Sequence, residues 1–61
     1  MRLIDGKGRR RAVHLKRIDG GWLAWVRVGL VARRSVAATG AMTAVRRLAD
    51  YMGMLGWREE R

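Results

Sequence analysis

Arginine dominates the residues of this chain that could do chemistry. The sequence has 14 lysine and arginine residues against five aspartate and glutamate residues, a formal net charge of +9 on 61 residues. Twelve of the 14 cations are arginine, whose planar guanidinium suits bidentate contacts to phosphate or guanine. This charge balance favours a polyanionic partner, nucleic acid first and an anionic membrane second. A GC-rich genome would enrich arginine as well.

Groups that could catalyse a reaction are few and scattered. His14 is the only histidine and cysteine is absent, so a thiolate nucleophile, a thiolate metal site and a disulfide are all excluded. The acidic residues are spread along the chain at Asp5, Asp19 and Asp50, with Glu59–Glu60 near the end. No glycine-rich loop ends in Lys-Ser or Lys-Thr. We therefore expect a protein that is not an enzyme and uses no cofactor or metal.

The segment 20–30 predicts the β-strand around which the chain is organised. It is rich in tryptophan, valine and leucine, with a β-branched pair at Val26 and Val28, a composition typical of a strand. Every second side chain is apolar and is expected to face a core: Trp22, Ala24, Val26, Val28 and Leu30. The other face carries Trp25 beside Arg27, together with Leu23. A tryptophan next to an arginine on an outward face indicates a contact surface.

A hairpin is predicted to join this strand to the preceding one, residues 11–18. Asp19-Gly20-Gly21 supplies the turn, because glycine accepts the positive φ that a tight hairpin needs. Alternation along residues 11–18 places His14 and Lys16 on the same outward face as Trp25.

A third, shorter strand is predicted over residues 31–36. Gly29 is expected to mark a bend, a bulge or the end of the second strand. Arg33 and Arg34 fall on opposite faces of the third strand, and which one points outward depends on the geometry at Gly29. One continuous strand over residues 22–33 is the alternative.

The period changes to about 3.6 residues after Thr39, which predicts a helix with Thr39 as its N-cap. Gly53 and Gly56 offer points of termination, and Trp57 is expected to fold back onto the hydrophobic cluster. One apolar stripe is predicted: Met42, Val45, Leu48, Ala49, Met52 and Leu55. The predicted fold class is α+β, a two- to three-stranded antiparallel sheet packed against one C-terminal amphipathic helix in the order β-β-β-α.

Three segments make up the predicted domain organisation. Residues 1–11 are expected to form a flexible basic N-terminal arm, residues 12–57 a single domain, and residues 58–61 a charged tail. The arm carries Arg9, Arg10 and Arg11 after two glycines, a composition that binds phosphates or a minor groove; a solvated terminus is the alternative. Neither a signal peptide nor a membrane span is recognisable, so we expect a cytoplasmic protein with no membrane partner.

The segment 21–28, Gly-Trp-Leu-Ala-Trp-Val-Arg-Val, resembles the second strand of two groups of DNA-binding domains. One is the Apetala or ethylene-response-factor type, with its relatives in phage homing endonucleases, and the other is the arm-type domain of tyrosine recombinases. The resemblance covers residues 11–51 and implies a sheet that lies in the major groove, with Trp25 and Arg27 in contact with DNA. The aromatic segment that usually precedes the helix in these families is replaced here by residues 35–39, which leaves RNA or protein open as the target.

The predicted function is that of a small nucleic-acid-binding protein that uses the outward sheet face and the basic arm, with double-stranded DNA first and RNA as a second target. Trp25 is expected to stack on a sugar or base, or to contact a thymine methyl group. The residues expected to bind nucleic acid are Arg9, Arg10, Arg11, His14, Lys16, Trp25, Arg27, Arg33 and Arg34. The alternative is a phage- or mobile-element-type inhibitor of a host protein, with Trp25 and Leu23 as its binding hot spot. A homodimer is compatible with both of these predicted functions.

Overall fold

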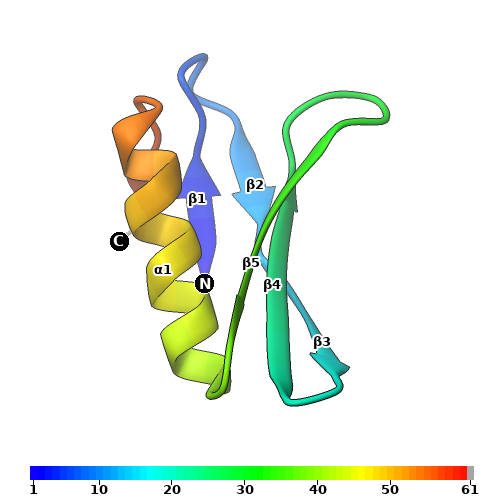
Figure 1. The fold of residues 1–61 in the computed structure, drawn as a ribbon. Helices are drawn as coiled ribbons and strands as arrows, with labels where there is room; N and C mark the ends of the chain where they lie inside the picture. Colours follow the sequence, from blue (N-terminus) through cyan, green and yellow to red (C-terminus); the bar gives the residue numbers. More distant parts are fainter. Residues whose placement is uncertain (61) are drawn as a thin grey trace.

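The computed structural model describes residues 1–60, which form two small antiparallel sheets and one helix (Figure 1). The elements are β1 (Arg2–Ile4), β2 (Arg10–Ala12), β3 (His14–Ile18), β4 (Gly21–Arg27), β5 (Arg33–Ala38), α1 (Ala41–Met54) and β6 (Arg58–Glu59). The strand orders are β2–β1–β6 and β3–β4–β5. The predicted α+β class is confirmed, and the second sheet, β2–β1–β6, is an addition to the predicted β-β-β-α order.

The β3–β4 hairpin closes where the glycines predicted it. Ile18 pairs with Gly21 across a two-residue turn, and Gly20 adopts a φ of +81°, which glycine tolerates without a steric penalty. Gly21 has a different role. A Cβ atom at this position would overlap the backbone carbonyl oxygen of Ala38, so glycine lets the end of β5 come close to the start of β4.

Alternation along β4 follows the prediction. Ala24 and Val26 are completely buried and belong to the core that α1 covers, whereas Arg27 is exposed and Trp25 is half-buried on the opposite face. Apolar side chains are therefore removed from water on the face of the sheet next to the helix, where their burial stabilises the fold. The predicted assignment of the two faces is correct.

β5 begins two residues later than the strand predicted over residues 31–36. The chain turns in a loop after β4, and the loop is closed by a hydrogen bond from the Val28 N–H to the Ala32 carbonyl oxygen (3.0 Å). A continuous strand over residues 22–33 is thus wrong. Arg33 pairs with Arg27 and so lies on the outward face, whereas Arg34 pairs with Val26.

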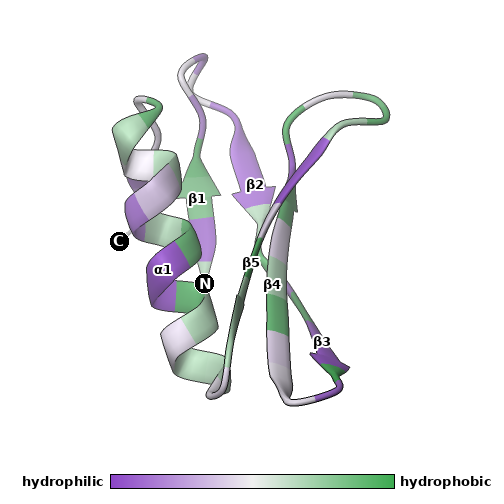
Figure 2. Cartoon of the chain, in the orientation of Figure 1, coloured by the Kyte–Doolittle hydropathy of each residue, from purple (hydrophilic) through white to green (hydrophobic). Residues whose placement is uncertain are grey.

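The loop between β4 and β5 is apolar at its tip and coloured accordingly in Figure 2. Leu30 and Val31 are almost fully exposed, at 94% and 93%. Leu30 was predicted to continue the core face of the strand, and this is wrong because β4 ends at Arg27.

The helix α1 lies against β4 and β5 (Figure 1). Its N-cap is Gly40, with no side-chain hydrogen bond, so the prediction of Thr39 as the N-cap is wrong. Met42 and Leu55 are exposed, at 76% and 52%, because one lies in the first turn beside the buried stripe and the other follows the last helical residue. The buried helical residues are Ala44, Val45, Leu48, Ala49 and Met52.

Glycine ends the helix through a Schellman arrangement. The Trp57 N–H donates to the Met52 carbonyl oxygen (3.0 Å) and the Gly56 N–H donates to the Gly53 carbonyl oxygen (3.1 Å). Gly56 has a φ of +92°, the left-handed conformation that this motif requires. Trp57 consequently returns to the core and packs against it, as predicted.

The structure corrects the expected flexible arm. Residues 2–12 form the antiparallel β1–β2 hairpin, and Leu3 is 1% exposed in the same core cluster as Leu48. Burial of Leu3 and Ile4 gives this segment a reason to pack, while its arginines remain at the surface of β2, which Figure 2 shows as hydrophilic.

The predicted charged tail is also partly structured. Arg58–Glu59 forms β6, which pairs with β1, and the Glu60 N–H donates to the Arg2 carbonyl oxygen (3.1 Å). Arg61, the last residue of the predicted tail, lies outside the described residues.

Candidate nucleic-acid interface

The face of the β3–β4–β5 sheet opposite α1 is basic and aromatic. We call it the outer face; register and alternation assign it His14, Lys16, Ile18, Leu23, Trp25, Arg27, Arg33, Ser35 and Ala37. No acidic residue is among these positions. The helix on the other side of the sheet takes up the apolar side chains, so the outer face remains open to solvent and to a partner.

Trp25 lies at the centre of the outer face and is covered by two neighbours. Its ring stacks on the His14 imidazole, with centroids 4.2 Å apart and planes 20° from parallel. The Arg33 Cζ atom lies 4.5 Å from the centroid of the Trp25 ring, a cation–π contact. His14 is directly opposite Trp25 in the register, and Arg33 is diagonal to it on the other neighbouring strand.

Arg27 and Arg33 are directly opposite each other in the β4–β5 register. Like charges in such a pair repel, and both residues are exposed. The Arg27 Nη1 atom donates to the Leu30 carbonyl oxygen (3.2 Å), which satisfies one donor without neutralising the charge. An anion placed between the two guanidinium groups would relieve this repulsion.

Ion pairs place Asp5, Asp50, Glu59 and Glu60 against arginines elsewhere on the molecule. Ion pairs join Arg10 to Glu60 (3.0 Å) and Arg46 to Glu59 (2.9 Å). The Arg46 guanidinium donates two hydrogen bonds to the Glu59 carboxylate, and these raise the pKa of Arg46 above its ordinary value. No ion pair involves the outer-face cations Lys16, Arg27 and Arg33 within residues 1–60.

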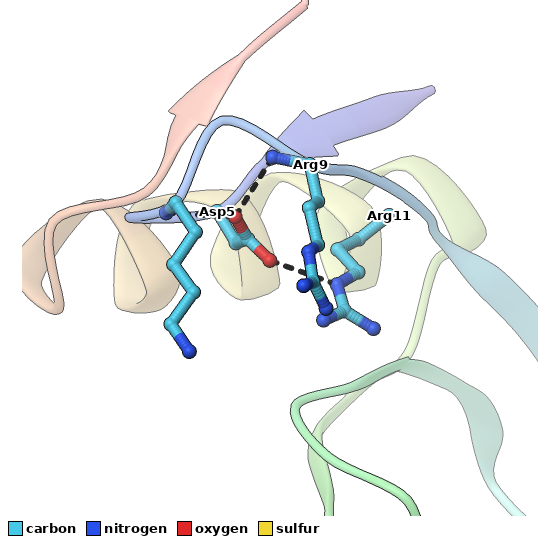
Figure 3. A network of polar contacts seen from close by, with 4 residues as sticks. Asp5, Arg9 and Arg11 are labelled. Carbon is cyan, nitrogen blue, oxygen red and sulfur yellow. Dashed lines mark hydrogen bonds and ion pairs between the residues drawn. The ribbon is translucent and has the colours of Figure 1, made fainter.

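Asp5 organises the β1–β2 turn (Figure 3). Its Oδ1 atom accepts hydrogen bonds from the backbone N–H groups of Lys7 and Arg9, each at 2.9 Å. Its Oδ2 atom accepts one from Arg11 Nε at 3.0 Å. These donors, the Arg9 N–H above all, lower the pKa of Asp5 below 3.8, against the opposing effect of desolvation. The carboxylate thus holds the turn that carries Lys7 and Arg9 and also binds the side chain of Arg11 in β2.

The nine residues predicted to bind nucleic acid fall into three places. The structure brings His14, Lys16, Trp25, Arg27 and Arg33 together on the outer face. Arg9, Arg10 and Arg11 belong to the β1–β2 hairpin. Arg34 lies apart from the outer face because it pairs with Val26. Sequence reasoning did not select Lys7, although its position between two glycines is typical of an exposed turn.

Other kinds of site are not apparent in the described chain. Residues 1–60 contain no group of three or more His, Cys, Asp or Glu side chains that could hold a metal ion. No helix among the same residues has the length and apolar character needed to cross a membrane.

Comparisons with protein-family models, with curated proteins and with solved structures found no match to this chain. A function for this chain therefore has to be inferred from the geometry of the outer face.

Proposed function

We propose that this protein binds nucleic acid, with double-stranded DNA as the favoured target, and that it acts by binding and not by catalysis. One observation carries the proposal. The outer face combines the cations Lys16, Arg27 and Arg33 with an ordered His14–Trp25–Arg33 stack and contains no acidic residue. A basic face of this kind attracts the phosphate backbone.

The stack on Trp25 supports a duplex target over a single strand. Proteins that bind single strands offer open aromatic rings to unstacked bases, whereas His14 and Arg33 occupy the ring surface of Trp25 that a base would need. The exposed part of the indole can still contact a sugar or a thymine methyl group. Trp25 is therefore assigned mainly to the support of its neighbours, in place of the base stacking expected from the sequence.

Arg33 is assigned a bidentate contact, which requires a guanidinium group of fixed orientation. The cation–π contact with Trp25 restricts its guanidinium, and a restricted guanidinium loses less conformational entropy when it forms paired hydrogen bonds to guanine O6 and N7 or to a phosphate. Lys16 and Arg27 are assigned phosphate contacts at the two sides of the stack. The resemblance of the β4 sequence to sheet-type DNA-binding domains agrees with this arrangement.

The test is a titration of random duplex DNA and of single-stranded RNA with the parent protein and three variants. Arg33→Ala and Arg27→Ala should remain folded and weaken duplex binding. Each variant neutralises fewer phosphates and so releases fewer counterions, which makes its affinity less dependent on salt. The loss of affinity relative to the parent should therefore shrink at high salt. Arg47→Ala is the matched control, since it removes an exposed arginine from α1, on the opposite side of the sheet.

Two results would contradict the proposal. Equal losses for Arg33→Ala and Arg47→Ala would mean that total charge, and not the outer face, decides binding. The absence of duplex binding, together with capture of a protein partner whose affinity depends on Trp25 and persists at high salt, would instead favour the inhibitor alternative.

A further inference from the structure

A basic groove lies next to the outer face, at the end of β4. It has a volume of about 610 Å³ and is bordered by the β1–β2 turn, the β4–β5 loop and Trp57. Its lining includes the cations Lys7, Arg9, Arg11 and Arg27. Residues far apart in the sequence thus converge on one space, and Arg27 belongs to both the groove and the outer face.

The charges around the groove are not balanced from within the described chain. Asp5 is the only carboxylate in its lining, and Asp5 already accepts hydrogen bonds from two backbone N–H groups and from Arg11 Nε. The Arg11 side chain is only 26% exposed, so solvent screens its charge less than that of a fully exposed arginine. Four cations gathered around one satisfied carboxylate favour the arrival of an anion.

The walls of the groove are held in place. Asp5 fixes the turn that carries Lys7 and Arg9 (Figure 3), and its contact with Nε leaves the two terminal nitrogens of Arg11 available as donors. On the other side, Arg27 donates to the Leu30 carbonyl oxygen and so restrains the β4–β5 loop. Such a preorganised set of donors binds an anion at a lower entropic cost than a flexible arm would.

We propose that this groove binds a phosphate group, specifically one phosphodiester of a DNA backbone whose bases face the outer face. That the phosphate belongs to DNA rests on the proposed function. That the groove binds a phosphate at all rests on the cations that line it. Arg27 makes the connection, because it reaches both the groove and the sheet surface. The groove would set the register of the duplex on the protein, since phosphate contacts position a protein without reading sequence.

Lys7→Gln/Arg9→Gln is the variant that tests the groove. It removes two charges and keeps the backbone N–H groups that Asp5 needs, so circular dichroism should show an intact fold. Arg47→Gln/Arg58→Gln is the control, because it removes two exposed charges that line neither this groove nor the outer face. The measurements are the salt dependence of duplex binding and an NMR titration with inorganic phosphate that follows the Arg Nε–H signals.

Loss of one phosphate contact should reduce the slope of log K against log salt by about 0.9. Between 50 and 200 mM salt, the groove variant should then lose about 3.5-fold less affinity than the parent. The control should keep the parent slope. Inorganic phosphate should shift the Arg9 and Arg11 Nε–H signals of the parent, and should shift the Arg11 signal less in the groove variant.

The outcomes separate this inference from the proposed function. Duplex binding that depends on Arg33, with the same slope in the groove variant and the control, overturns the groove and leaves the function standing. Phosphate shifts at Arg11 without any duplex binding support the phosphate site and overturn the function. In that case, binding to phosphatidylglycerol vesicles, absent for neutral vesicles and for the groove variant, would identify a lipid headgroup as the source. Absence of shifts at Arg9 and Arg11 overturns the phosphate site itself.

Discussion

Replacement of Trp25 by leucine should remove the stacked contacts at the centre of the outer face while keeping an apolar residue on the strand. The stack has two contacts whose energies can be separated, one to His14 at 4.2 Å and one to Arg33 at 4.5 Å. Since both partners lie on the strands next to β4, removal of the ring should release both and lower the free energy of unfolding.

The expected sizes follow from the geometry. A stacked aromatic pair contributes roughly 0.5–1.5 kcal/mol beyond the area that it buries, and a cation–π contact at an exposed site contributes roughly 0.5–1 kcal/mol. The double-mutant cycle of Trp25→Leu with His14→Ala should therefore give a coupling energy of about 1 kcal/mol, and the cycle with Arg33→Ala a smaller one of about 0.7 kcal/mol.

Urea unfolding measures these free energies, provided that the m-value is unchanged among the variants. It is followed by the circular dichroism of the backbone, because the tryptophan signal itself changes in Trp25→Leu. The cycle of Trp25→Leu with Arg47→Ala on α1 is the control and should be additive within about 0.5 kcal/mol. Coupling energies near zero in both test cycles would refute the stack as an ordered unit. The same result would also refute the view that Trp25 restricts the guanidinium group of Arg33.

Two further predictions concern the core and the β1–β2 turn. Val26→Asp should abolish the cooperative thermal transition, because it places an unpaired carboxylate at a completely buried position; a variant that melts like the parent would contradict the assigned faces. Asp5 has a lowered pKa in the folded state, so its contribution to stability is present above its unfolded pKa of 3.8 and is lost as the pH falls through the folded value. The free energy of unfolding should therefore fall more steeply below about pH 5 for the parent than for Asp5→Asn, and parallel curves in urea unfolding would show that Asp5 is not responsible.

Local signals explain the parts of the fold that the sequence predicted. The two faces of β4 follow from a period of two, and the β3–β4 turn follows from glycine at position 20 with its positive φ. The helix follows from a period of 3.6, although periodicity alone placed Met42 in the core. Burial of a helical residue also depends on where the sheet ends beneath it, and that boundary is a tertiary property.

The β2–β1–β6 sheet had no comparable local signal. Its strands contain two or three residues each, too few for a period to appear, and β1 is held by contacts to segments more than 40 residues away, including β6. A run of arginines after two glycines therefore predicted an arm. The groove was hidden for the same reason, since Lys7, Arg27 and Trp57 meet there only after both sheets and the end of the helix are in place.

The role of Trp25 depends on register more than on its own exposure. Alternation correctly placed the ring on the outward face, and an outward tryptophan on a basic sheet suggested a platform for a base. The observed register puts His14 directly opposite the ring and Arg33 diagonal to it, and both approach closely enough to cover the indole. A two-residue shift of β5 that paired Trp25 with Ala37 in place of Ser35 would move Arg33 away from the ring. Because the β4–β5 loop determines that register, the apolar loop is as important to the outer face as the residues on it.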